Sequence, residues 1–277
     1  IAEQTLPYGD IVAICDVDRQ HAEKAREHFG GKADLYEDYR KLLERHDVDV
    51  VTIGTPDHWH AAMAVAACKA GKDVYCEKPL TLTVNEGKLL CRVVGETHRV
   101  FQVGTWQRSD HRFRLACELI HAGRIGKLGK VLVTLGKNVT GGPFKVEDPP
   151  PHLNWDMWLG PRAYRPYQYN ICPYNFRWWN DYSSQMGNWG VHYMDVIRWM
   201  MGEKAPVAIS AVGGKYVLDD DRTIPDTMDV IFEFASGALI TFSIYEASSG
   251  SLFQYGEVEL RGTLGTLNAG EKGYKIA

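Results

Sequence analysis

Hydrophobic residues in the first hundred positions form short continuous runs that alternate with amphipathic segments. The runs are apolar almost throughout, which is typical of strands buried on both faces. They lie at 11–18, 48–56, 73–76 and 100–105. The amphipathic segments have helical spacing and lie at 19–31, 38–47, 60–72 and 84–97. Strands separated by helices of this length predict βαβ units and a parallel sheet.

The pattern changes after a further helix and its exit turn at 111–129. A strand is predicted at 130–139, an irregular aromatic stretch at 140–187, and a helix at 188–201. Strand-like segments separated by short turns then follow at 207–218, 227–234, 238–247 and 251–262. This order predicts an antiparallel meander. The fold class is therefore α/β, with a parallel-sheet domain at 1–107 and an α/β domain with a large, mostly antiparallel open sheet at 108–277.

The strand that ends at Asp16 suggests the dinucleotide-binding, Rossmann-type fold. In that fold a G-x-G-x-x-G loop precedes this acid by about 20 residues. The sequence has no such loop, and the glycines of 123–129 have the wrong spacing and precede a strand. We expect the first strand and its glycine loop to lie upstream of Ile1, so that the first domain is truncated at its start. The alternative is an α/β domain that binds no nucleotide.

Composition narrows the class of protein further. The 277 residues are 45% hydrophobic and 24% charged, as in soluble globular proteins with about two domains. The net charge is −4 without a basic stripe, which argues against a nucleic-acid partner, and no run of about 18 apolar residues predicts a membrane span. The six cysteines form no C-x-x-C pair, so we expect buried thiols in a reducing, cytoplasmic compartment. The alternative that an export signal lies upstream of Ile1 stays open.

Candidate cofactor-binding residues follow the predicted parallel strands, where ligands bind in open α/β sheets. Asp16 is predicted to bind the adenosine ribose hydroxyls, while Asp18 fits better as the cap of the next helix. NAD is favoured over NADP because no arginine follows Asp16 immediately, although Arg19 is close. Thr55 and Pro56 shape a turn whose backbone can face a nicotinamide ribose.

Glu77, Lys78 and Pro79 end a third strand and face the same predicted cleft. Lys78 can hydrogen-bond a substrate hydroxyl and stabilise the charge that develops as its proton leaves. Glu77 can orient Lys78 or bind the cofactor ribose. The alternative is an ordinary surface ion pair before a helix.

Two histidines follow Pro56 and raise the question of a metal site. We expect His58 in a loop and His60 at the start of a helix, beside the cofactor. A third ligand with plausible spacing is not evident, so no metal is predicted. Gln107, at the end of another strand, is assigned to the cofactor, and Arg108 to the substrate.

A second polar constellation lies on the helix at 188–201. Asn188, His192, Asp195 and Trp199 are spaced to share one helix face. Half-buried His192 suits a general base, and Asp195 is assigned to the substrate; the alternative is a core histidine with satisfied hydrogen bonds. Gly187 and Gly190 are expected to let a ligand or another chain approach closely.

The aromatic stretch at 152–182 allows two interpretations. Its rings, among them Trp178, can stack on a sugar, or they can simply pack against one another.

These residues resemble the Gfo/Idh/MocA family of oxidoreductases. The block "VDVVTIGTPDHWHAAMAVAACKAGKDVYCEKPLTLTVNE" carries the most specific similarity, and "WDMWLGP", "FRWW" and "GNWGVHYMDVIRWMMG" support it. The resemblance implies NAD(P)-dependent oxidation of sugars, cyclitols or glycosides, and a homodimer or homotetramer formed through the second sheet. Lys78 matches the lysine of the family's E-K-P motif, and His192 matches the histidine of its D-x-x-x-H motif. Asn188 replaces the aspartate of that motif, which is a departure from the family pattern.

The predicted reaction places a carbohydrate hydroxyl between Lys78 and His192. His192 takes the proton while the carbon-bound hydrogen leaves as hydride to nicotinamide. Two alternatives stay open: an NAD-dependent, redox-neutral glycosidase or epimerase, and a non-catalytic NAD-binding regulator, which Asn188 favours.

Overall fold

The computed structural model describes residues 2–136, 141–173, 175–248, 258–270 and 273–277. The chain folds into two compact units, each built from discontinuous segments. Unit 1 comprises Ile1–Gly104, Lys145–Phe176 and Asp181–Ser183. Unit 2 comprises Thr105–Phe144, Arg177–Asn180 and Ser184–Ala277. Part of the aromatic stretch therefore packs with the first hundred residues rather than with its neighbours in sequence.

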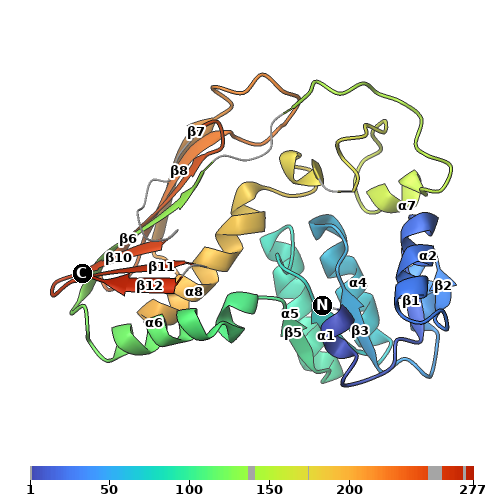
Figure 1. Ribbon diagram of the computed structural model, residues 1–277, viewed down its shortest axis with the longest axis horizontal. Coiled ribbons are helices and arrows are strands. Elements are labelled where there is room, and N and C mark those ends of the chain that lie inside the picture. Colours follow the sequence, from blue (N-terminus) through green and yellow to red (C-terminus); the bar gives the residue numbers. More distant parts are fainter. Residues whose placement is uncertain (1, 137–140, 174, 249–257, 271–272) are drawn as a thin grey trace. The chain divides into compact units, whose positions relative to one another are not determined.

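Unit 1 has the predicted alternation of parallel strands and helices (Figure 1). One parallel pair consists of β1 (Ala13–Cys15) and β2 (Asp34–Tyr36). A parallel three-stranded sheet has the order β3 (Val50–Ile53), β4 (Asp73–Cys76) and β5 (Phe101–Val103). The helices of this unit are α1 (Ala2–Thr5), α2 (Arg19–His28), α3 (Tyr39–Leu43), α4 (Asp57–Lys69), α5 (Val84–Thr97) and the short α7 (Trp155–Leu159).

The core of unit 1 forms where α4 and α5 cover the three-stranded sheet. Small residues of α4, such as Ala64 and Ala67, are 0% and 1% exposed and let the helix approach Val74 closely. The helix α4 begins at Asp57, so the expectation that His58 lies in a loop and that the helix starts at His60 is wrong. Proline at the preceding position and an acid in the first turn both favour this earlier start.

Unit 2 is built on a seven-stranded sheet with the order β12-β11-β10-β6-β9-β8-β7. Neighbouring strands are antiparallel except for β6 and β9, which confirms the predicted mostly antiparallel sheet. The strands are β6 (Leu128–Leu135), β7 (Ala208–Gly214), β8 (Thr227–Glu233), β9 (Leu239–Tyr245), β10 (Val258–Gly262), β11 (Thr266–Gly270) and β12 (Gly273–Ile276). Parts of the strands predicted at 130–139 and 251–262 lie outside the described residues.

The helical elements of unit 2 lie near one face of this sheet (Figure 1). They are the 3₁₀-helix η1 (Trp106–Ser109), α6 (His111–His121), the π-helical turn η3 (Met186–Gly190) and α8 (Val191–Met201). A further 3₁₀-helix, η2 (Asn175–Trp178), has residues in both units. The helix predicted at 188–201 thus begins as a π-turn, a feature frequent at functional sites.

The core of unit 2 lies between the sheet and the helices α6 and α8. Alternate residues of β9, Ile240, Phe242 and Ile244, are at most 1% exposed and pack with Ile197 of α8. A Cβ atom at Gly190 would collide with Met186 and contact Phe242. Gly190 therefore lets core side chains approach, rather than the ligand or second chain that we expected there.

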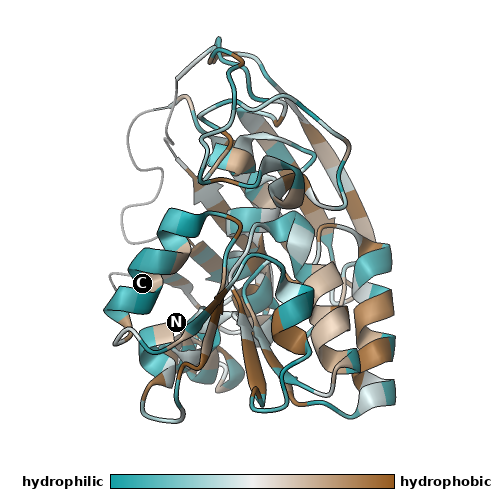
Figure 2. Cartoon of the chain, turned by 90° about the vertical axis from the view of Figure 1, so that its right-hand side faces the viewer, coloured by the Kyte–Doolittle hydropathy of each residue, from teal (hydrophilic) through white to brown (hydrophobic). Residues whose placement is uncertain are grey.

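The hydropathy of the residues can be compared with the positions of the strands and helices. Figure 2 shows hydrophobic residues in the strands, and helices that range from largely hydrophilic to largely hydrophobic. Among the described residues, none of the helices is both long enough and apolar enough to cross a membrane.

A substitution at Gly160 tests how the segment after residue 145 packs within unit 1. Its φ is +54°, and a Cβ atom there would overlap the indole ring of Trp59. We expect Gly160→Ala to lower the free energy of unfolding by about 2–4 kcal/mol, because the backbone is strained and the indole must move. Denaturant unfolding measures the change.

The matched control is Gly95→Ala inside α5, where a Cβ atom would meet nothing within 4 Å. This variant is expected to gain up to about 1 kcal/mol from helix propensity. Equal unfolding midpoints for the two variants would contradict the predicted packing.

Candidate active site

Candidate site residues follow the carboxyl ends of the parallel strands in unit 1. Thr55 comes after β3, Glu77 and Lys78 after β4, and Gly104 after β5. Because β3, β4 and β5 are hydrogen-bonded in parallel, these residues share one edge of the three-stranded sheet. Asp16 holds the corresponding position after β1 in the neighbouring pair of strands.

The two acids after β1 have different roles. Asp18 caps α2 by accepting hydrogen bonds from the backbone N–H groups of Gln20 (2.9 Å) and His21 (3.2 Å), which confirms the predicted cap. Asp16 Oδ1 accepts from the Asp18 N–H at 2.8 Å. Burial raises the pKa of the Asp16 carboxyl, although this hydrogen bond opposes the shift. Asp16 is thus a half-buried acceptor that hydroxyl groups of a ribose would satisfy.

The turn after β3 contains an unsatisfied hydroxyl. Thr55 Oγ1 is buried and has no hydrogen-bond partner among the described residues. A buried polar atom without a partner is costly, so a bound ligand that hydrogen-bonds it would be favoured. This observation fits a nucleotide cofactor at the edge formed by β3, β4 and β5.

His60 lies in the first turn of α4 and is 1% exposed. Its Nε2 lies 2.7 Å from the carbonyl oxygen of Thr55, and its Nδ1 lies 2.6 Å from that of Pro79. We predicted that His60 contacts the cofactor, but both of its ring nitrogens instead face backbone carbonyl groups.

The turn after β4 presents Lys78, whose backbone N–H donates to Glu77 Oε2 at 3.1 Å. A Cβ atom at Gly104 would lie 2.9 Å from Glu77 Oε1, so the glycine at the end of β5 leaves room for this carboxylate. Sequence reasoning missed Gly104, although its place directly after a predicted strand was a usable signal. The Lys78–Pro79 peptide bond is cis.

In unit 2, η1 lies along the face of α8 that carries His192, Asp195 and Trp199. His192 is 5% exposed, and its ring centroid lies 5.7 Å from that of Trp106. The guanidinium of Arg108 donates to both oxygens of Asp195, at 2.7 and 2.9 Å, and lies 5.4 Å from the Trp199 ring centroid. The predicted common face is therefore confirmed for these three residues of α8.

Two other predicted residues around α8, Asn188 and Gln107, are buried. Asn188 lies in η3, is 8% exposed, and its N–H donates to the Ser184 carbonyl at 2.8 Å. Gln107 of η1 is 3% exposed, and its Oε1 has no hydrogen-bond partner in the described part of the chain. Arg108 and Asp195, both assigned to the substrate, neutralise each other in the ion pair, which raises the pKa of Arg108.

Trp178, also assigned to the substrate, is 2% exposed and lies 4.7 Å below the guanidinium of Arg222. The fully buried Arg222 pairs with Asp220 at 2.7 Å and with Glu246, which also accepts a hydrogen bond from Gln185. Sequence reasoning missed this buried ion cluster. The run of acidic residues before Arg222 could have indicated an ion cluster, but such a run is equally typical of a solvated loop. The exposed area of Trp178 gives no support to a substrate-binding role.

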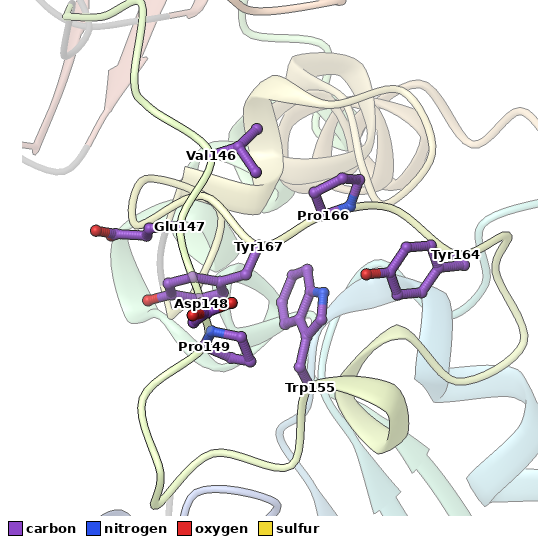
Figure 3. A pocket seen from close by; sticks show the side chains of 8 residues that line it. All are labelled: Val146, Glu147, Asp148, Pro149, Trp155, Tyr164, Pro166 and Tyr167. Carbon is purple, nitrogen blue, oxygen red and sulfur yellow. The ribbon is translucent and has the colours of Figure 1, made fainter.

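A cavity of about 550 Å³ opens among aromatic and proline residues of unit 1 (Figure 3). Its lining consists of Val146, Glu147, Asp148, Pro149, Trp155, Tyr164, Pro166 and Tyr167. The indole of Trp155 stacks on Trp158 with centroids 4.8 Å apart and donates to the Arg165 carbonyl at 2.9 Å. These rings pack on one another, as in the second interpretation of the aromatic stretch, and none of the predicted site residues lines the cavity.

His58 differs from His60 in its surroundings. It is 2% exposed, its Nε2 lies 2.9 Å from the Trp158 carbonyl, and its Nδ1 has no partner among the described residues. Burial lowers the pKa of His58 from 6.5 to about 4. Within the described ranges, no group of three or more histidine, cysteine, aspartate or glutamate side chains could hold a metal ion.

Two family models together match most of the chain. The model described as "Oxidoreductase family, NAD-binding Rossmann fold" matches residues 2–105. The model described as "Oxidoreductase family, C-terminal alpha/beta domain" matches residues 136–248. The chain belongs to the Gfo/Idh/MocA oxidoreductase family, which confirms the resemblance found in its sequence.

Similar proteins include sugar and cyclitol dehydrogenases. Levoglucosan dehydrogenase of Pseudarthrobacter phenanthrenivorans is 26% identical over 90% of this chain and 66% of its own length. Inositol 2-dehydrogenase of Salmonella typhimurium is 35% identical over 44% of this chain and 37% of its own length. A solved levoglucosan dehydrogenase complex with NADH and levoglucosan shares the fold, with a TM-score of 0.72 and 24% identity over 93% of this chain and 64% of that one. The chain thus spans less than two thirds of these relatives.

The buried His58 predicts a pH dependence of stability. Its folded pKa of about 4 lies below the ordinary value of 6.5, so between these values the unfolded chain binds the extra proton. The stabilisation is complete above pH 6.5 and falls by about 3 kcal/mol as the pH drops to 4. Denaturant unfolding across this range should show a shallower pH slope for His58→Gln than for the unmodified chain. Identical slopes would mean that His58 does not carry the effect.

Proposed function

We propose that the protein is an NAD-dependent dehydrogenase that oxidises a hydroxyl group of a sugar, cyclitol or glycoside. The observation that carries the proposal is Lys78 at the carboxyl end of β4, on the sheet edge that also holds Thr55 and its unsatisfied hydroxyl. Family membership and the names of the similar dehydrogenases support the same reaction class.

The first part of the chain, 1–107, is proposed to bind the cofactor. Asp16 would accept hydrogen bonds from the adenosine ribose hydroxyls, and Thr55, Pro56, Glu77 and Gln107 would bind nearer the nicotinamide. We favour NAD over NADP, because a carboxylate at Asp16 repels a 2′-phosphate. When bound, the nicotinamide ring accepts the hydride that leaves the alcohol carbon.

The residues of the chain supply the proton chemistry in this proposal. The Lys78 ammonium hydrogen-bonds the alcohol oxygen and stabilises its developing negative charge. His192 takes the hydroxyl proton as general base. Asn188 orients the alcohol by hydrogen bonding, since its amide cannot act as the carboxylate base found at this position in the family motif.

The part at 108–277 is proposed to bind the substrate and to form a homodimer or homotetramer. Arg108 and Asp195 are its proposed substrate residues, whereas the buried Trp178 is not proposed to touch the substrate. β7 is an edge strand of the sheet formed by the described residues, and Ile209 and Val212 are 59% and 71% exposed. A second copy pairing edge to edge with β7 would extend this sheet. The six free cysteines, four of them buried, are consistent with our expectation of a reducing, cytoplasmic location.

Two other activities stay under consideration, and Asn188 favours the second of them. A redox-neutral glycosidase or epimerase would release product without net NADH. A non-catalytic regulator would bind NAD and turn over no sugar at all.

The dehydrogenase proposal predicts NADH formation in stopped-flow absorbance with a panel of sugars and cyclitols. Lys78→Met and His192→Gln should each lower kcat/KM by about 10²–10⁴, because the first removes the cation that stabilises the developing charge and the second removes the general base. The control Lys88→Met changes an exposed lysine on α5 and should leave kcat/KM unchanged. Binding of NAD without reduction by any sugar would reject dehydrogenation and favour the other two activities.

The assembly proposal predicts that charges on β7 dissociate the oligomer. Ile209→Asp combined with Val212→Asp should lower the mass measured by light scattering, because charged side chains on an edge strand oppose pairing with another strand. Val84→Asp is the control, since Val84 is 76% exposed on α5. An unchanged mass for the β7 variant would place the interface elsewhere.

A further inference from the structure

The hydrogen bonds of His60 are unusual for a buried histidine. Both ring nitrogens lie within 2.7 Å of backbone carbonyl oxygens, those of Thr55 and Pro79. A carbonyl oxygen only accepts hydrogen bonds, so each of these contacts requires a proton on the imidazole nitrogen. A neutral imidazole carries one such proton, and its second nitrogen would then turn a lone pair toward a carbonyl lone pair.

We propose that His60 is a positioning residue, held as a doubly protonated imidazolium that clamps the turn after β3 to the turn after β4. The clamp holds the carbonyl of Thr55, whose hydroxyl has no partner among the described residues, and the carbonyl of Pro79, which directly follows Lys78. His60 therefore acts on the reaction through Lys78 and Thr55, without touching the substrate.

The neighbouring His58 shows the contrasting arrangement. It is equally buried but contacts one carbonyl, and one proton satisfies that contact. Burial is the main reason why its pKa falls to about 4, and the positive charges of Arg162 and His60 add to the effect. The hydrogen bonds therefore assign a neutral ring to His58 and a positively charged ring to His60, although both are buried in the same helical turn.

A buried cation in the first turn of α4 is opposed by the positive end of the helix dipole. Two carbonyl dipoles and the carboxylate of Asp57, 4% exposed in the same turn, act in the opposite direction. Other titratable groups that adjoin the clamped segments in sequence are His58, on α4 beside His60, and Glu77 and Lys78, which precede Pro79. Charge-assisted hydrogen bonds to the two carbonyls are stronger than neutral ones, so the cation also tightens the clamp.

The decisive experiment is nuclear magnetic resonance of the full chain with ¹⁵N-labelled histidine, at about pH 7.5, where an ordinary histidine is mostly neutral. We expect both ring nitrogens of His60 to have the chemical shift of protonated nitrogen. The signal is assigned by its loss in His60→Gln or, if that variant does not fold, by its loss in His60→Asn. One unprotonated nitrogen in His60 would overturn the proposal.

The positioning role rests on the proposed dehydrogenase activity and is tested by kinetics. His60→Gln donates to one carbonyl but cannot carry charge, so kcat should fall about tenfold or more while KM for NAD changes less than about threefold. His58→Gln should keep kcat within about twofold. An unchanged kcat in His60→Gln would refute the positioning role. If the unmodified chain forms NADH with none of the sugars tested, the proposed dehydrogenase activity is rejected. The protonation of His60 found by nuclear magnetic resonance would not be affected by that result.

Discussion

Parallel hydrogen bonding among β3, β4 and β5 is the constraint on which the candidate site depends. The register aligns Ile53 with Cys76, and Cys76 with Val103. The ladder continues beyond the strands, because Glu77 N–H donates to Ile53 O at 2.9 Å and Gly104 N–H donates to Cys76 O at 2.8 Å. The residues that follow each strand must then emerge at one edge, however far apart they lie in sequence.

Polar contacts with the backbone stabilise the turns that follow β3 and β4. His60 connects two of the turns, Glu77 accepts from the N–H of its neighbour, and Gly104 leaves space for that carboxylate. Buried backbone carbonyl groups need hydrogen-bond donors, and a histidine in the first turn of α4 can reach two of them. The residues that surround Lys78 are therefore held by their own structure before any ligand binds.

The aromatic stretch shows how burial overrides sequence order. His58 and Trp59 of α4 hydrogen-bond to backbone carbonyls near Trp158, and the rings of His58, Trp158 and Tyr182 lie about 5 Å apart. Each large ring gains by leaving water, and indole and imidazole N–H groups need acceptors once buried. Both requirements are met within unit 1, so residues 145–176 fold with a unit that their sequence position alone does not indicate.

Sequence pattern determined the alternation of strands and helices, the mostly antiparallel second sheet and the common face of His192, Asp195 and Trp199, because period and strand-end position are local properties of the chain. Family motifs also identified Lys78 and His192 as candidates. Tertiary structure decided which groups contact one another. Arg108 donates to Asp195, Arg222 lies over the ring of Trp178, and His60 contacts two backbone carbonyls. These pairings join residues between 5 and 87 positions apart in the chain. Hydrophobic period specifies which face of an element is buried, but only packing in three dimensions selects the groups that meet there.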